Sequence, residues 1–140
     1  MASTKTDSLR RTVLDAAVAI SAANGPDAIS MREVARKAGV SHQAPYHHFA
    51  DRRGVFRAIA LDGFTRLGDA LVQAMSAPAD EQSGALLEAY VEFALANPGQ
   101  FRVMFRSDLC DMENAPELQA FADAAFDTLI DHVRTKLGEG

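Results

Sequence analysis

The chain has 140 residues, of which 48% are hydrophobic, and a formal net charge of −5. This length and apolar content can bury one sizeable core, which indicates one compact unit or a small module joined to a larger one. A single cysteine, Cys110, excludes an internal disulfide, the polar N-terminus shows no secretory signal, and no apolar run approaches the roughly 20 residues of a membrane span. These features favour the cytoplasm and predict no membrane partner.

The charge is spread unevenly along the chain. Residues 1–66 hold ten Lys and Arg against six Asp and Glu, which gives +4, whereas residues 67–140 hold four against thirteen, which gives −9. DNA affinity depends on the local field, because exposed charges more than a Debye length of roughly 8–10 Å apart are largely screened. The negative total therefore does not exclude DNA as a partner of the basic part, although a solvated charged face is the simpler alternative.

Hydrophobic periodicity predicts an all-α chain with no strand-like alternation. A first helix is expected over residues 8–23, because four apolar residues recur on one side of it: Val13, Leu14, Ala17 and Ile20. The turn signal at residues 24–26, Asn-Gly-Pro, would end it.

A second helix is expected over residues 31–38. Ser30 and Glu33 have the spacing of a capping box, in which each side chain accepts a backbone N–H at the helix start. Gly39 can adopt the left-handed conformation that ends a helix at low cost. Ala35 is small enough to let two helices cross closely, and Val40 is expected to be buried between them. The pattern therefore predicts a helix followed by a tight turn.

A third, short helix is expected over residues 42–48, with Ser41 as its N-cap. It is rich in polar donors, and burial of one face is what normally stabilises a short helix, so we expect it to face a polar partner. Gln43 can pair with adenine and Ala44 can touch a thymine methyl, whereas Tyr46 and His48 can reach phosphate oxygens. The residues expected to contact DNA are Arg32, Ser41, His42, Gln43, Ala44, Tyr46, His47, His48 and Arg52.

Three motifs follow one another in this region. Residues 35–41 form an Ala-x-x-x-Gly-Val-Ser turn, residues 46–49 an aromatic-x-His-Phe sequence, and Arg52-Arg53 a basic start to the next helix. With them, residues 10–60 resemble the DNA-binding domain of the TetR family of bacterial transcriptional regulators. Arg52 stands where the family usually has Lys, and it should keep the phosphate contact. Residues 85–109 resemble, more weakly, the ligand-domain segment of one TetR subgroup.

A long fourth helix is expected to begin after the N-cap Asp51 and to reach about Pro78, joining the DNA-binding unit to the rest. Gly63 and Gly68 on this helix are expected to allow close contacts with other helices. Residues 86–97 are apolar nearly all round, which predicts a buried helix. A short helix after Asn97-Pro98 and a last helix that opens around residues 114–117 complete the pattern. The predicted domains are residues 1–52 for DNA binding and residues 53–140 for regulation.

The regulatory part carries aromatic and Met side chains that suit an adaptable apolar pocket. The candidates are Phe64, Leu67, Met75, Tyr90, Phe93, Met104, Phe105, Phe121 and Phe126. A place in the core is the simpler interpretation for any one of them. The resemblance, more than the residues, implies a small and mainly apolar ligand.

The last helix has a second apolar face at Phe126 and Ile130. TetR-like proteins usually continue with two further helices that make the dimer, and residue 140 comes before them. The regulatory domain would then be incomplete at its C-terminus, or the last helix would pair with another copy. The sequence leaves both alternatives open, although the resemblance implies a homodimer on an operator.

The sequence gives no support to an enzyme, a metal or a cofactor. His42, His47 and His48 are spaced by five and one, so no pair has the i, i+4 geometry that suits zinc on a helix. Cys110 has no nearby His, and no phosphate-binding Gly loop or G-x-S-x-G sequence occurs. The resemblance to the TetR family implies a sequence-specific transcriptional regulator, a repressor released by its ligand. The alternative is a helical protein-interaction or small-molecule-carrier module whose helix-turn-helix is vestigial.

Overall fold

The computed structural model describes residues 2–138, with side chains from residue 5 onward. The described chain is all-α, as predicted. Its helices are α1 (Ala2–Asn24), α2 (Met31–Ala38), α3 (Ala44–His48), α4 (Arg52–Ala74), α5 (Gln82–Ala96), α6 (Pro98–Met104), α7 (Ser107–Cys110) and α8 (Pro116–Lys136). Short 3₁₀ turns join them: η1 (Pro26–Ala28), η2 (Ala79–Glu81) and η3 (Met112–Asn114). Among the described helices, none combines the length and the hydropathy that crossing a membrane would require.

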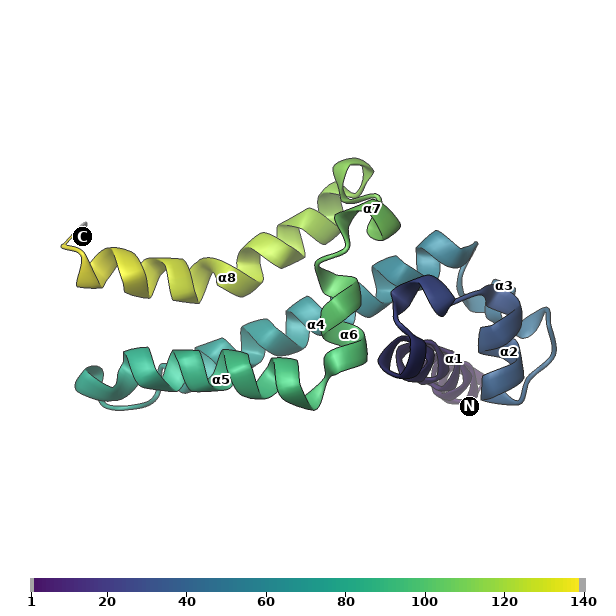
Figure 1. Ribbon diagram of the computed structural model, residues 1–140, viewed down its shortest axis with the longest axis horizontal. Coiled ribbons are helices and arrows are strands. Elements are labelled where there is room, and N and C mark those ends of the chain that lie inside the picture. The colour runs from purple at the N-terminus through teal and green to yellow at the C-terminus, as the bar shows by residue number, and fades with distance from the viewer. Residues whose placement is uncertain (1, 139–140) are drawn as a thin grey trace.

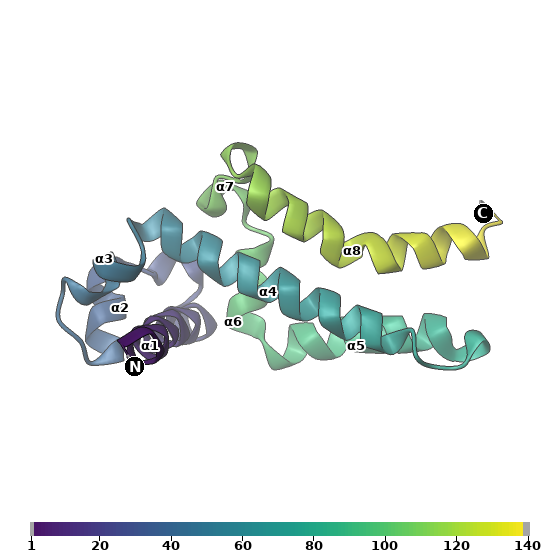
Figure 2. The same ribbon diagram turned by 180° about the vertical axis from the view of Figure 1, so that it is seen from behind.

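The α4 helix runs along the long axis of the molecule and connects its two ends (Figure 1). α1, α2 and α3 gather around the N-terminal part of α4, whereas α5 and α8 flank its C-terminal part (Figures 1 and 2). α6 crosses between these two groups and packs against both α1 and α4. The α3 helix and the end of α8 therefore lie at opposite ends of the molecule.

Local signals set the backbone around α2 and the start of α4. The Ser30 hydroxyl accepts a hydrogen bond from the Glu33 backbone N–H at 3.1 Å, and Gly39 ends α2 with φ of 71°. Asp51 caps α4 by accepting the Gly54 N–H at 2.8 Å. These contacts confirm the predicted bounds of α2 and the predicted start of α4. Only half of the capping box forms, because the Glu33 carboxylate pairs with Arg36 instead.

The third helix is shorter than predicted. α3 begins at Ala44, with Gln43 at its N-cap position, and no side chain caps it. The N-cap role predicted for Ser41 is wrong, because residues 41–43 form a turn closed by the Ala44 N–H donating to the Ser41 carbonyl at 3.1 Å. Val40 is half-buried against the core rather than fully buried.

Three glycines set how closely the helices pack. A Cβ at Gly63 would lie 2.7 Å from Met104 Cγ, and one at Gly68 would lie 3.2 Å from Ala125 Cα, which confirms the close contacts expected there. The sequence did not predict a close contact at Gly99. A Cβ at Gly99 would lie 2.8 Å from the Ala22 backbone nitrogen, so only glycine lets α6 approach α1 this closely.

The prediction of a buried helix at residues 86–97 is wrong. α5 buries Leu86 and Phe93, whereas Leu87 and Leu95 are 66% and 76% exposed. The reason is that α5 packs against α4 and α6 and also contacts α8, while the side that carries Leu87 and Leu95 has no neighbouring helix among the described residues. An apolar composition all round the helix could not show which side would meet a partner.

Candidate nucleic-acid interface and ligand pocket

One side of the α3 helix packs against the rest of the domain, and the other side is exposed to solvent. Ala44, Pro45 and Phe49 are buried against the body of the domain. The outer side carries Gln43 and Tyr46, both exposed, Tyr46 to 50%. Because the apolar residues hold the backbone, the polar side chains are presented to solvent by a fixed scaffold.

Most residues predicted to contact DNA are exposed. These are Arg32, Ser41, His42, Gln43, Tyr46 and His47. His48 is half-buried, with its ring centroid 6.3 Å from that of Phe49. The thymine contact predicted for Ala44 is corrected. Ala44 lies on the buried side of α3 and is only 8% exposed, so its methyl group has almost no accessible surface for a thymine.

Arg52 has partners within the protein, which the sequence did not predict. Its Nε donates to the Ile29 carbonyl at 2.5 Å and its Nη2 to the Asp27 carbonyl at 3.1 Å. Its guanidinium also lies 4.7 Å from the ring centroid of Phe56. These contacts tie the start of α4 to the segment before α2. Arg52 thus serves the shape of the domain, and its predicted phosphate contact stays untested.

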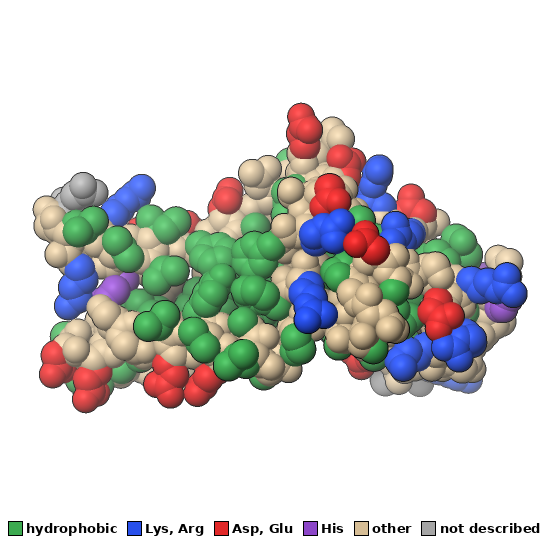
Figure 3. Space-filling view, in the orientation of Figure 1, with side chains coloured by type: hydrophobic (Ala, Val, Ile, Leu, Met, Phe, Trp, Pro, Cys, Tyr) green, Lys and Arg blue, Asp and Glu red, His purple; other side chains and the backbone are tan. Residues whose placement is uncertain are grey.

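Other basic residues lie around α3. Lys37, in the last turn of α2, is exposed, and Arg53 is exposed and pairs with Asp111 at 3.4 Å. Arg36 donates to Glu33, and that hydrogen bond lowers the pKa of the Glu33 carboxyl. Lys and Arg side chains are prominent at this end of the molecule (Figure 3). The excess of basic residues in the N-terminal part was the available signal for Lys37.

Polar contacts join the α3 end of the molecule to α6. The side chain of Gln100, 2% exposed on α6, donates to the Ile59 carbonyl at 3.1 Å and to Asp62 Oδ2 at 2.8 Å. Arg11 of α1 donates to the same Asp62 at 3.2 Å. Burial alone would raise the pKa of Asp62, but the hydrogen bonds from Gln100 and Arg11 outweigh it and the pKa is lowered.

A second link runs through Arg106, which follows α6. Its guanidinium donates to Asp27 of η1 at 3.2 Å and to Asp108 at 2.9 Å. The hydrogen bond from Arg106 lowers the pKa of Asp108 to about 2. The junction between the two ends of the molecule therefore combines charged and buried polar contacts.

Aromatic side chains meet between α4, α5, α6 and α8. Phe64 lies 5.8 Å from Phe105 and 6.3 Å from Phe126, measured between ring centroids. Tyr90 is 5.9 Å from Phe101 and 6.3 Å from Phe126. A broad group of apolar side chains occupies the middle of this face in Figure 3. Beside the rings is a pocket of about 260 Å³, whose lining includes Phe64, Met104, Phe105, Met112, Asp123 and Phe126.

The nine residues predicted to line a ligand cavity fall into separate places. Four line this pocket: Phe64, Met104, Phe105 and Phe126. Phe121 lines a hollow on the other side of α8, and Phe93 a groove between α4 and α5. Leu67 is fully buried in the core, and Met75 and Tyr90 pack against it. The core interpretation therefore holds for Leu67.

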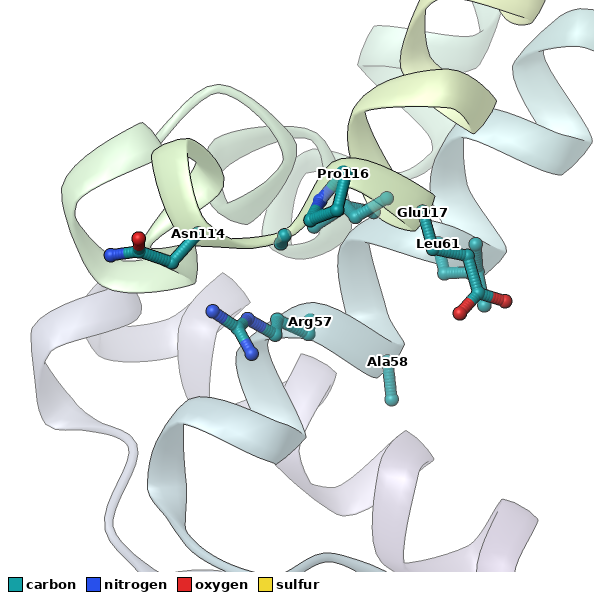
Figure 4. Close-up of a pocket in the computed structure, with 8 residues that line it drawn as sticks. Arg57, Ala58, Leu61, Asn114, Pro116 and Glu117 are labelled. Atoms are coloured by element: carbon teal, nitrogen blue, oxygen red, sulfur yellow. The ribbon is translucent and has the colours of Figure 1, made fainter.

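A larger hollow of about 380 Å³ lies between the first half of α4 and the start of α8. Figure 4 shows Arg57 on α4 facing the segment that carries Asn114 and Pro116. Arg57 donates to the Cys110 carbonyl at 2.8 Å and to Asp111, so its charge is largely satisfied within the protein. No aromatic ring is among the described residues that line this hollow, which makes it a poorer match to an apolar ligand than the smaller pocket.

The described side chains show few features of a catalytic site. Within residues 2–138, no three His, Cys, Asp or Glu side chains come together as a possible metal site. Cys110 is buried, and its Sγ lies 3.6 Å from the Val103 carbonyl oxygen. Burial raises the pKa of this thiol to about 11, so it stays protonated and weakly nucleophilic at neutral pH.

Comparison with known proteins agrees with this geometry. Residues 13–59 match the model of bacterial regulatory proteins of the tetR family, and residues 84–140 match a tetracyclin repressor-like C-terminal domain. The chain belongs to the TetR family. Within this TetR-family chain the first match runs from the second half of α1 to the first turns of α4, and the second spans most of α5 through to α8.

Several individual proteins are similar to this TetR-family chain, and two of them are described as transcriptional regulators. It is 37% identical over 84 residues to the HTH-type transcriptional regulator AlkX of Mycobacterium tuberculosis, a match that spans 60% of this chain and 38% of AlkX. A structure of unknown function from Rhodococcus sp. RHA1 has a TM-score of 0.74 at 34% identity, covering 94% of this chain and 69% of that one. The TetR family regulator PfmR of Thermus thermophilus has a TM-score of 0.77 at 25% identity, with coverages of 91% and 71%.

Proposed function

We propose that this TetR-family protein is a sequence-specific DNA-binding repressor in the cytoplasm, which occupies a pseudo-palindromic operator as a dimer and is released by a small, mainly apolar ligand. The observation that carries the proposal is the α3 surface. Its backbone is fixed by buried Ala44, Pro45 and Phe49, whereas Gln43 and Tyr46 project into solvent. A short helix built in this way suits insertion into a major groove.

The proposed roles differ along this surface. Gln43 pairs with adenine, because its amide can donate and accept side by side. Tyr46, His47 and Arg32 contact phosphates, which positions the protein without selecting a sequence. Arg52 keeps the start of α4 in place through the Asp27 and Ile29 carbonyls, so it supports the reading surface from within the domain.

The dimer proposal rests on geometry and on the exposed apolar residues of α8. A helix-turn-helix reader gains affinity when two copies lie about one helical turn apart, roughly 34–36 Å. Ile130, Val133 and Leu137 are 44%, 46% and 70% exposed on α8. Exposed apolar groups of this kind are suited to an interface with a second copy.

The ligand proposal rests on the pocket beside α6. Met104 of α6 contacts the α4 helix at Gly63, and Gln100 of the same helix hydrogen-bonds Ile59 and Asp62 of α4. A ligand that displaces Met104 or Phe105 would shift α6 against α4 and α1, and would thereby change the spacing of the two α3 helices in a dimer. That coupling requires the ligand to bind the DNA-free arrangement more tightly.

Selection of bound fragments from a random DNA pool tests the DNA-binding proposal directly. Enrichment of a two-fold symmetric site with half-sites about one helical turn apart would support it, and Gln43→Ala should abolish the enrichment at one position in each half-site. If the protein enriches no sequence and binds DNA only weakly at low salt, the vestigial helix-turn-helix of the carrier alternative is correct.

A further inference from the structure

We propose that the pocket between α4, α6 and α8 takes a small organic cation that carries an aromatic or branched apolar group. The inference rests on the ligand site of the proposed function, and it adds the charge that the ligand must have. It depends on three observations: the rings that line the pocket, the sign of the ionisable group among the lining residues, and the field of the surrounding chain.

Three aromatic rings line the pocket at steep angles to one another. Phe64 and Phe105 lie at an interplanar angle of 80°, and Phe64 and Phe126 at 69°, so the three rings do not stack as a flat layer. Phe105 is 47% exposed, which leaves ring surface open to a ligand. Aromatic faces carry negative partial charge, and a cation within about 6 Å of a ring centroid is attracted to them. A neutral ligand of the same shape gains burial alone.

The described lining contains one ionisable side chain, and it is acidic. Asp123 of α8 lies at the exposed rim of the pocket, and no Lys or Arg is among the described residues that line it. Arg106, next to Phe105 in the chain, is held by Asp27 and Asp108. Arg57 is held by Asp111. An anionic ligand would therefore meet a like charge at the rim and no opposite charge within the described lining.

Outside the lining, the charge near the pocket is also negative. The hollow on the other side of α8 shares Phe64, and Asp69 is the one ionisable residue of its described lining. Residues 67–140 sum to −9, and of these charges the ones within about a Debye length of the pocket act on a ligand there. Each contribution favours a cation over an anion of similar size.

Three probes of nearly equal shape separate charge from size. Phenyltrimethylammonium is the cation, tert-butylbenzene is its neutral isostere, and benzenesulfonate is a comparable anion. NMR titration of the full chain can follow the methyl groups of Met104 and Met112, which line the pocket, against Met31 of α2 as a remote reference. We expect the cation to bind about fivefold more tightly than its isostere. We expect benzenesulfonate to bind still more weakly, by about tenfold relative to the cation.

Two variants and a matched control locate the effect. Asp123→Asn should weaken binding of the cation about threefold, as expected for one exposed charge, and should leave tert-butylbenzene unchanged. Asp127→Asn removes the same charge one turn further along α8, outside the lining, and should have a smaller effect. Phe105→Leu keeps an apolar side chain but removes a ring, so it should reduce the preference for the cation over its isostere.

The outcomes separate this inference from the proposed function. It is overturned if benzenesulfonate or tert-butylbenzene binds as tightly as the cation, if no probe shifts Met104 and Met112, or if Asp123→Asn and Asp127→Asn weaken the cation equally. DNA selection is measured independently. A protein that binds the cation but selects no DNA would refute the repressor proposal and leave the ligand class standing.

Discussion

The two ends of the molecule reach their structures by different routes. Around α2 and the start of α4, contacts between residues close in sequence fix the backbone: the Ser30 cap, the left-handed Gly39 and the Asp51 cap each act within a few residues. Around α5 and α8, side chains far apart in the sequence meet, as Phe64 and Phe126 do. The comparison teaches that the segments on either side of α3 are specified locally, whereas α3 itself and the pocket depend on packing.

Gly99→Ala should produce the largest effect, because Gly99 lies at the junction of the two ends. The new Cβ would collide with the Val18 carbonyl and lie 2.8 Å from the Ala22 nitrogen, both backbone atoms that cannot move alone. Overpacking of this kind should lower the free energy of unfolding by about 3 kcal/mol in a urea titration. The matched control is Gly84→Ala on α5, where nothing lies within 4 Å of the added Cβ and stability should not fall. A loss equal in both variants would show that α1 and α6 are not closely packed.

Gln43→Ala should cost about 2 kcal/mol of binding free energy on the best operator, and much less on random DNA. The reason is that a base contact contributes only where the matching base is present. Mobility shifts on selected and scrambled sites measure the difference. Gln73→Ala, on the far half of α4, is the control and should change neither. An equal loss on both sites would assign Gln43 to phosphate contact.

Ser30→Ala should lower the free energy of unfolding by about 1 kcal/mol, because the Glu33 N–H loses its acceptor at the start of α2. Ser41→Ala is the matched control, since Ser41 is exposed and caps no helix. Thermal or urea unfolding of the two variants measures the difference. A larger loss of unfolding free energy from Ser41→Ala would show that Ser41 caps a helix, as the sequence predicted.

Arg52→Ala and Arg32→Ala should separate internal support from phosphate contact. Arg32→Ala should make the dependence of log affinity on log salt shallower by about one and leave stability unchanged. Arg52→Ala removes donors to two carbonyls, so it should lower stability by about 1 kcal/mol and change the salt dependence little. A shallower salt dependence in the Arg52 variant would instead show that Arg52 contacts a phosphate.

Acid should weaken the junction by a smaller amount. The pKa of Asp62 is lower in the folded protein than its ordinary value of 3.8, so the unfolded chain binds a proton first as the pH falls. The contribution of Asp62 is therefore present above about pH 4 and is lost as the pH falls through the lower folded value. The free energy of unfolding, measured between about pH 5 and pH 2, should fall less steeply with decreasing pH in Asp62→Asn than in the unchanged protein. Equal slopes would indicate that the Arg11 and Gln100 contacts contribute little.

The sequence by itself determined the elements whose signals are local. Ser30, Gly39 and Asp51 predicted the bounds of α2 and the start of α4, because capping and left-handed turns depend on single residues and their near neighbours. The succession of motifs from residue 35 to residue 53 also pointed to the TetR family, which the family comparison confirmed. The outward position of Gln43 and Tyr46 agrees with the predicted interface, although their DNA contacts stay predictions.

Tertiary structure alone decided which side of α5 would be covered and which distant groups α3 and α4 would contact. The apolar composition of α5 predicted a buried helix, but the placement of α4 and α6 left Leu87 and Leu95 exposed. The same kind of contact buried Ala44 and gave Arg52 its carbonyl partners across more than twenty residues. Burial and long-range hydrogen bonding depend on where distant segments pack, and periodicity along one helix carries no information on that placement.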